Sequence, residues 1–328
     1  MKWCGWWEIL LSPFSERKVC SFVVFSAFAY HDNGETFSDS NYREGMFATS
    51  NEKISFIGGD IRMIYAAEHF LREGNHVFLY GFEKAEKRQD GMIFSDDIDF
   101  VLEGADKIVF PVPMSKDKES VVAPFSENKI YAEDVLSKIS EKTKIYGGMV
   151  GTGIYKREIY DYAARDDFSI RNAVPTAEAV MMLAIKETSM TIFKMRAAVI
   201  GFGRVGRVLS KSLVSLGADV SVFAGRAESK AIGDTYFCET FDFADFKNNA
   251  NKFDCVFNTV PHTVLFGDSL AALKPDTPII ELASSPGGID REAAKSIGIN
   301  IVDAPSLPGR VTPKTAGMII YKTLSEMS

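Results

Sequence analysis

The chain has 328 residues, of which 46% are hydrophobic and 25% charged, and its formal net charge is −7. The length suggests roughly two domains of about 150 residues, and the composition excludes a disordered chain, a collagen-like chain and a small disulfide scaffold. An acidic chain has no global basic field, so we expect neither nucleic acid nor a membrane as a partner. Its 4 cysteines and 4 histidines form no CxxC pair or cluster, so we expect no metal site and a reduced cytoplasmic compartment.

Residues 1–50 differ from the rest of the chain, because they hold all 3 tryptophans and show no regular α/β pattern. Their apolar run, Val19–Tyr30, is too short to span a bilayer, and no small-residue cleavage site follows it. Regular patterning starts only at Lys53, shortly after Met46. We therefore expect residues 1–50 to be an extension outside the fold, and we assign them no function.

From Lys53 onward, short apolar runs alternate with helical patterns, which is typical of parallel strands joined by crossover helices. In the first half the pattern predicts a strand, a glycine turn, a helix and a second strand, at Ile54–Ile57, Gly58-Gly59-Asp60, Ile61–Glu73 and Val77–Tyr80. The second half repeats this layout with a strand at Ala197–Ile200, the turn Gly201-Phe202-Gly203-Arg204-Val205-Gly206, a helix ending at Gly217 and a strand at Val220–Phe223. Further strands are predicted at Cys255–Val260, Pro278–Ala283 and Ile299–Val302.

These patterns predict an α/β protein with two Rossmann-like, doubly wound parallel-sheet domains. We expect a substrate domain over 51–174, a linking helix over 175–192, a nucleotide-binding domain over 193–305 and a C-terminal helix over 306–328 that returns to the first domain. The linking helix is expected to open at Pro175, with Ala177, Val180, Met181, Ala184 and Ile185 as its apolar stripe.

Only the second glycine turn has the three glycines of a dinucleotide fingerprint, Gly201, Gly203 and Gly206. The first turn has Asp60 and Met63 at the second and third positions, where a carboxylate repels a pyrophosphate and a long side chain blocks close packing. The alternative is a turn used only for packing. Cofactor contacts are expected from Gly201, Phe202, Gly203, Arg204, Val205, Gly206, Arg226, Thr259, Val260 and Pro261.

The end of the second strand of this unit favours NADP over NAD. An NAD site usually has an acidic residue there for the ribose hydroxyls, but this stretch reads Phe223-Ala224-Gly225-Arg226. The guanidinium of Arg226 could bind a 2′-phosphate, with Ser229 and Lys230 nearby. The alternative is a solvated surface arginine.

Ligands of open α/β sheets bind beyond the carboxyl ends of the strands, so the loops there are expected to line the site. They are Thr259–His262, Ser284–Gly288 and Pro305–Arg310. A final helix is predicted to open with Thr312 as its N-cap, Pro313 in the first position and Lys314 in the first turn, a start suited to a carboxylate ligand.

Five motifs occur in a recognisable order: Ile57–Arg62, Pro175–Glu178, Gly201–Gly206, Leu282–Gly288 and Leu307–Gly317. From about residue 52 to the C-terminus this set resembles the A-subunit family of dipicolinate synthase, found in spore-forming bacteria. The last two motifs carry the resemblance most specifically. Ser285 stands where the family has a basic residue, Arg310 where it has an aliphatic one, Ala179 replaces a glycine, and His262 replaces a small residue. One positive charge of the site is therefore expected at Arg310.

The resemblance implies NADP-dependent oxidation of dihydrodipicolinate to dipicolinate during sporulation, in the mother-cell cytoplasm. It also implies that the partner is a flavoprotein-like B subunit. The sequence leaves open whether the chain forms a homo-oligomer. The substrate is a small dianion, so the site needs convergent cations and hydroxyls. The substrate-binding residues expected on this basis are Arg62, Thr176, Glu178, Ser284, Gly287, Gly288, Arg310 and Lys314, and the catalytic candidates are Asp60 and His262.

Each of these assignments has a structural alternative. Asp60 could instead cap the helix that starts at Ile61, and Thr176 and Glu178 could belong to a plain helix start. The loop with Ser284, Gly287 and Gly288 is expected to offer backbone N–H donors to the substrate, but it could form an ordinary tight turn. His262 could be an incidental loop residue. Arg62 and Lys314 could be solvated.

Two other functions stay open at this point. An NAD(P)-dependent 2-hydroxy-acid or alanine dehydrogenase shares the two-domain plan, but no histidine has an evident acidic or lysine partner. The second alternative is a non-catalytic subunit that binds NADP, because no residue is unambiguously the catalytic base.

A chain that begins at Met46 is expected to fold and to bind cofactor like the full chain, because residues 1–50 lack periodic patterning. Thermal melting of both proteins checks this. A large fall in melting temperature on truncation would show that the N-terminal aromatic residues pack on the core.

Overall fold

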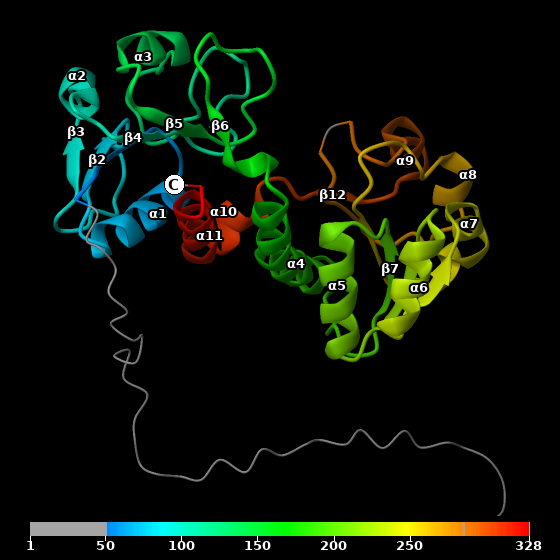
Figure 1. Ribbon diagram of the computed structural model, residues 1–328. Coiled ribbons are helices and arrows are strands. Elements are labelled where there is room, and N and C mark those ends of the chain that lie inside the picture. The colour runs from blue at the N-terminus through cyan, green and yellow to red at the C-terminus, as the bar shows by residue number, and fades with distance from the viewer. Residues whose placement is uncertain (1–50, 285, 328) are drawn as a thin grey trace, which may run out of the picture. The chain divides into compact units, whose positions relative to one another are not determined.

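The computed structural model describes residues 51–284 and 286–327. Their strands form two parallel sheets of six strands each, and helices pack around these sheets (Figure 1). The sheet orders are β3-β2-β1-β4-β5-β6 and β12-β11-β10-β7-β8-β9. In both sheets the first strand of the half lies inside the sheet and later strands add on either side, which is the doubly wound arrangement. The expected α/β class with two Rossmann-like sheets is confirmed. The expectation for residues 1–50 lies outside the described residues.

The first half follows the predicted layout and continues it with further short elements. In chain order it contains β1 (Lys53–Ile57), α1 (Ile61–Arg72), β2 (His76–Tyr80), β3 (Ile93–Ser95), α2 (Ile98–Leu102), β4 (Lys107–Val109), α3 (Ala132–Lys138), β5 (Lys144–Gly147), β6 (Tyr160–Asp161) and α4 (Asp166–Thr188). Strands of a parallel sheet are buried on both faces and are therefore mostly apolar. In β1, Ile54 and Phe56 belong to the core on one face of the sheet, and Ile57 belongs to the core on the other face.

The second half repeats the arrangement around β7. It contains β7 (Arg196–Ile200), α5 (Arg204–Ser215), β8 (Asp219–Phe223), α6 (Ala227–Thr235), β9 (Glu239–Phe241), α7 (Phe246–Asn249), β10 (Cys255–Asn258), α8 (Gly267–Leu270), β11 (Ile279–Glu281), α9 (Arg291–Ile297), β12 (Ile301–Asp303), α10 (Leu307–Val311) and α11 (Pro313–Ser325). All five predicted strands of this half are present, although β10 and β11 end before the predicted limits. None of the described helices is long and apolar enough to cross a membrane.

Helix α4 starts earlier than predicted. Its first turn contains Asp166 and Asp167, where the helix dipole favours carboxylates, and Pro175 lies inside the helix. The prediction that a helix opens at Pro175 is therefore wrong, as is its end at residue 192. Burial of Phe168 and Ala173 on the preceding turns outweighs the hydrogen bond that an internal proline loses.

Two segments contribute to the cores of both halves. Helix α4 places Phe168 in the core of the first sheet and Val180 in the core of the second. The C-terminal segment does the same, because Leu307 of α10 joins the second core and Ile320 of α11 joins the first. The two halves are thus connected by packed helices as well as by the chain itself.

Helix α11 packs against α1 at very close range (Figure 1). A Cβ atom on Gly317 would lie 2.5 Å from the Cβ of Tyr65 and 2.6 Å from the carbonyl oxygen of Arg62. Further along the same interface, the ring of Tyr321 stacks on that of His69 at 4.9 Å. Only glycine at position 317 allows this approach of the two helices.

Replacing Gly317 by Ala is expected to lower the free energy of unfolding by about 1–3 kcal/mol, the usual cost of overpacking a filled site. Met318 is exposed on the same helix, and its replacement by Ala should change stability by less than about 0.5 kcal/mol. Denaturant unfolding of both variants measures the difference. Equal stability of the two variants would show that α1 and α11 do not approach so closely.

Candidate functional site

The glycine turn between β7 and α5 has the backbone shape that a dinucleotide requires. Gly201 has a φ of +92°, and a Cβ there would come within 2.5 Å of the Thr259 Oγ1 atom. A Cβ on Gly206 would lie 2.4 Å from the carbonyl oxygen of Gly201. These two glycines therefore make the turn and let the helix pack closely on the strand.

Gly203 has a different environment, and this environment suits a ligand. It is the exposed N-cap residue of α5, and no heavy atom lies within 4 Å of the position that a Cβ would take. No packing contact of the described residues requires a glycine here, whereas the pyrophosphate of a dinucleotide does, because it approaches the backbone closely at the helix N-terminus. The residues of this turn fit a dinucleotide.

The other residues of the turn are partly engaged. Phe202 is buried in the core, so it can offer a ligand only its backbone. The guanidinium of Arg204 pairs with the carboxylate of Asp166 at the start of α4, and both side chains are exposed. The Val205 side chain is half-buried on α5.

The loop after β10 lies directly against the glycine turn. The hydroxyl of Thr259 donates to the carbonyl of Ile200 at 2.9 Å. A Cβ on Gly201 would also come within 2.7 Å of a methyl group of Val260. Pro261 and His262 follow and are exposed.

The corresponding turn of the first half has a different chemistry. Asp60 is the N-cap of α1, and its carboxylate accepts a hydrogen bond of 3.0 Å from the backbone N–H of Arg62. Gly59 has a φ of +107°, and a Cβ there would lie 2.3 Å from the Cγ of Met63. The Met63 side chain therefore fills the space that close helix packing uses in the second half.

Asp60 also orients Arg62. The Nε atom of Arg62 donates to Asp60 Oδ1 at 2.8 Å, and Nη2 donates to Oδ2 at 2.8 Å and to the carbonyl of Val112 at 2.6 Å. The Arg62 side chain is 12% exposed and that of Asp60 is 31% exposed. The Nη1 group of Arg62 has no partner among the described residues, so one edge of the guanidinium is available to an anion.

The chain's C-terminal motif reaches this ion pair. A Cβ on Gly309 of α10 would lie 2.9 Å from Arg62 Nε and 3.1 Å from Asp60 Oδ2, so any side chain there would displace the pair. Arg310, the next residue, is exposed in the last turn of α10, and Lys314 is exposed in the first turn of α11. Arg62 on α1 and the two cationic residues of the C-terminal segment, Arg310 and Lys314, therefore lie on segments that touch at Gly309.

Lys314 lies within electrostatic reach of α1. Burial lowers the pKa of His69, and the charges of Arg72 and Lys314 lower it further. Thr312 occupies the N-cap position of α11 as predicted, but its hydroxyl donates to the carbonyl of Pro308 at 3.4 Å and does not cap the helix.

Tyr162 lies fully buried close to the ion pair. Its hydroxyl donates to the carbonyl of Phe110 at 3.1 Å. Burial raises the pKa of Tyr162, an effect that the charge of Arg62 partly opposes. The phenol therefore stays protonated and serves as a structural donor.

The loop after β11 departs from the expectation for substrate binding. The backbone N–H of Gly287 donates to the carbonyl of Ser284 at 2.9 Å, and that of Gly288 donates to Glu281 Oε2 at 3.1 Å. The predicted donors Gly287 and Gly288 are therefore already engaged within the protein. The tight-turn alternative describes this loop better, with Ser284 exposed at its start.

Sequence reasoning missed Asn258 and Glu281, two buried polar residues that join the loops after β10 and β11. The Nδ2 atom of Asn258 donates to Glu281 Oε1 at 2.7 Å. Each is a polar residue at the end of an apolar, buried strand, and that position was the available signal.

Three predicted residues lie away from these contacts. Thr176 lies within α4, where its hydroxyl donates to the carbonyl of Asn172 at 2.7 Å. Glu178 is exposed on the same helix. Arg226 is the exposed N-cap residue of α6, while its predicted neighbour Lys230 pairs with Asp242 at 2.9 Å. Among the described residues, no hydrogen bond or ion pair joins them to Asp60 or Arg62.

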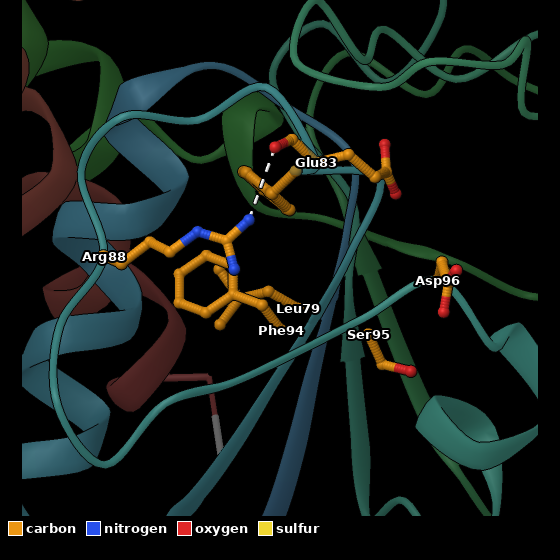
Figure 2. Close-up of a pocket in the computed structure, with 7 residues that line it drawn as sticks. Leu79, Glu83, Arg88, Phe94, Ser95 and Asp96 are labelled. Atoms are coloured by element: carbon orange, nitrogen blue, oxygen red, sulfur yellow. Dashed lines mark hydrogen bonds between the residues drawn. The ribbon is translucent and has the colours of Figure 1, made fainter.

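A separate cavity of about 270 Å³ lies at the ends of β2 and β3 (Figure 2). It is lined by Leu79, Phe82, Glu83, Arg88, Phe94, Ser95 and Asp96, none of which is a predicted site residue. The guanidinium of Arg88 lies over the ring of Phe94 at 4.8 Å and donates to the carbonyl of Glu83. Within residues 51–284 and 286–327, no cluster of three or more His, Cys, Asp or Glu could hold a metal ion.

Comparisons with known proteins agree on one family. Residues 53–162 match the family model of the N-terminal domain of the dipicolinate synthase A subunit. The chain is 31% identical over 282 residues to the dipicolinate synthase A subunit of Bacillus subtilis, covering 84% of this chain and 95% of that protein. The crystal structure of the A subunit from Bacillus halodurans superposes with a TM-score of 0.77 at 29% identity, covering 84% of this chain and 97% of that one. The A-subunit structure from Bacillus subtilis gives a TM-score of 0.75 at 31% identity, covering 85% and 96%. The chain therefore belongs to the dipicolinate synthase A-subunit family.

Proposed function

We propose that this chain oxidises dihydrodipicolinate to dipicolinate with NADP, in an enzyme that also has a B subunit. The family membership supports the reaction and the partner. The observation that carries the proposal is the half-buried Arg62–Asp60 pair beneath Gly309, with one edge of the guanidinium open. A dicarboxylate needs such a fixed cation, and the exposed Lys314 and Arg310 on the adjoining segment supply further positive charge.

The reaction removes a hydride from one ring carbon and a proton from the neighbouring carbon, and the ring becomes aromatic. NADP, when bound, supplies the hydride acceptor. The chain's own residues hold the two carboxylates, so that the reacting carbon stays in one orientation. Aromatisation provides much of the driving force, so positioning and a modest base suffice.

Asp60 and His262 are the two candidates for accepting the proton. Both oxygens of Asp60 already accept hydrogen bonds from Arg62, so its role is to orient the arginine. His262 is exposed on the loop that packs against Gly201, and no residue of the described chain occupies its ring nitrogens. We therefore assign proton acceptance to His262.

The assignment of NADP rests on Arg226. This arginine is exposed and unpaired within the described residues, directly after β8, where the second strand of a dinucleotide unit ends. The carboxylate that an NAD site usually has at this strand end is absent from Phe223 to Arg226. A 2′-phosphate would give the guanidinium a bidentate partner.

Purified full-length chain tests the proposal when supplied with NADP and with dihydrodipicolinate generated in situ. Formation of reduced nicotinamide and dipicolinate in equal amounts is the expected result, whether or not the B subunit is present. Turnover that needs the B subunit would assign this chain a binding role instead. Equal turnover of alanine or a 2-hydroxy acid would overturn the substrate assignment.

Replacing Arg226 by Ala is expected to weaken NADP binding by about 1–3 kcal/mol, the scale of a hydrogen bond to a charged group, and to leave NAD binding nearly unchanged. Isothermal titration with each cofactor measures this. Arg196→Ala is a suitable control, because Arg196 is paired with Asp254 and is the first residue of β7, at the end of that strand opposite the glycine turn. Equal losses for both cofactors would refute the 2′-phosphate contact.

Replacing Arg62 or Lys314 by Ala is expected to raise the KM for dihydrodipicolinate about tenfold or more, because each charged contact to a carboxylate contributes roughly 1.5–3 kcal/mol. NADP affinity should barely change. Replacing Arg62 by Lys should restore only part of the loss, since an ammonium cannot replace the planar fork.

The matched control for these variants is Arg72→Ala, an exposed arginine at the other end of α1. It should keep the wild-type KM. If the Arg62 and Lys314 variants also keep wild-type kinetics, the anion site lies elsewhere, and Arg310 is the next residue to replace.

A further inference from the structure

Glu281, at the end of β11, is a buried carboxylate that accepts hydrogen bonds only from neutral groups, and Arg291 lies within electrostatic reach of it. The residue is only 3% exposed. Oε1 accepts from Asn258 Nδ2 at 2.7 Å and from the Ala283 N–H at 3.0 Å, and Oε2 accepts from the Gly288 N–H at 3.1 Å. No lysine or arginine of the described chain forms an ion pair with it. A buried charge is costly unless its acceptors are satisfied, and here three donors satisfy them.

Asn258 extends this network from β11 to the end of β10. It is fully buried, and its Nδ2 atom donates to Glu281 and also to the carbonyl of Val260 at 3.0 Å. Its Oδ1 atom accepts from the Val260 N–H at 3.2 Å. The amide thus fixes both backbone groups of Val260, and Glu281 fixes the amide.

Val260 and Thr259 in turn contact the glycine turn. The position of a Cβ on Gly201 lies 2.7 Å from a Val260 methyl group and 2.5 Å from Thr259 Oγ1. A continuous set of contacts therefore runs from Glu281 through Asn258 to the turn that would hold the pyrophosphate. The same carboxylate also holds Gly288, so one side chain fixes the loops that follow two neighbouring strands.

The sheet order indicates which part of the cofactor these loops would meet. In the order β12-β11-β10-β7-β8-β9, strands β10 and β8 lie on opposite sides of β7. A dinucleotide lies across the carboxyl ends of such a sheet, with its adenosine half over β8, where Arg226 lies. The loops after β10 and β11 then lie on the nicotinamide side.

We propose that Glu281 is a positioning residue that holds these two loops in place around the nicotinamide half of the cofactor. This inference rests on the proposed function, because it needs a dinucleotide at the Gly201–Gly206 turn. Glu281 does not touch the cofactor and acts through Asn258, Val260 and Gly288. The glycine turn itself is also held by the Gly201 N–H, which donates to the carbonyl of Phe223 at 2.8 Å. Glu281 therefore acts mainly on the position of the nicotinamide ring, and the pyrophosphate and adenosine half depend on it much less.

The substitution Glu281→Gln tests the role with little change in shape. A glutamine side chain has one oxygen and one NH2 group, so in either orientation an NH2 group faces an N–H donor of the loops. The loops must then shift. Glu281→Asp keeps both acceptor oxygens and should restore part of the function.

The matched control is Asp303→Asn. Asp303 is the register partner of Glu281 on β12 and is also a carboxylate, but its side chain is 57% exposed and pairs with Arg291 at the surface. It carries no loop contact to the glycine turn, so Asp303→Asn controls for a changed charge near Arg291, which lies within electrostatic reach of Glu281.

The experiment compares the affinity of the full chain for NADP with its affinity for 2′-phospho-ADP-ribose, which lacks the nicotinamide ring. The wild type and Asp303→Asn should bind NADP more tightly than the fragment. Glu281→Gln should lose that preference, with NADP affinity falling about tenfold and fragment affinity changing less than about twofold. In steady-state assays its kcat should fall about tenfold or more at unchanged KM for dihydrodipicolinate.

The outcomes separate this inference from the proposed function. No binding of either ligand to the wild type would refute the cofactor assignment and with it the inference. Equal wild-type affinity for both ligands, or a preference that Glu281→Gln retains, would refute the inference alone. If Glu281→Gln fails to fold, Glu281→Asp decides: a reduced preference for NADP at wild-type fragment affinity supports the role, and an unchanged preference contradicts it.

Discussion

The contact that the candidate site depends on is the approach of Gly309 to the Arg62–Asp60 pair. Residue 309 has no side chain, so the backbone of α10 can approach the two charged groups closely. A Cβ atom there would lie 2.9 Å from Arg62 Nε and 3.1 Å from Asp60 Oδ2. The neighbouring Leu307 is held in the core of the second sheet, and α11 packs on α1 through Gly317. The ion pair of the first half is therefore part of a candidate site to which the end of the chain also contributes.

The two halves use one backbone layout for two kinds of chemistry. In the second half, Gly203 leaves open space at the N-terminus of α5, and Gly206 lets this helix approach β7. In the first half, Asp60 caps α1 and Met63 fills the corresponding space. A carboxylate at the turn disfavours a phosphate, but it orients an arginine that can bind a carboxylate substrate. The expected nucleotide turn and the expected substrate turn thus differ at the second and third positions of the glycine fingerprint.

The sequence predicts seven of the twelve described strands and the first helix, because buried parallel strands are apolar runs and because glycines mark the turns around α1 and α5. The short strands β3, β4, β5, β6 and β9 are not predicted. The predicted start of α4 is wrong, since Pro175 resembles a first helical position, whereas packing of the earlier residue Phe168 extends the helix. The prediction of free N–H groups on Gly287 and Gly288 is also wrong. These N–H groups donate to the carbonyl of Ser284 in the loop and to the carboxylate of Glu281 at the end of β11. Such pairings depend on which strands become neighbours, and neither spacing nor composition reveals them.

The central claim is that the open edge of Arg62 binds a carboxylate of the substrate. A crystal structure of the chain with the product pyridine-2,6-dicarboxylate tests it most directly. We expect one carboxylate within hydrogen-bond distance of Arg62 Nη1, with Asp60 still paired to Nε and Nη2. A bound product with no carboxylate at Arg62, while the Arg62–Asp60 pair stays as it is, would contradict this claim.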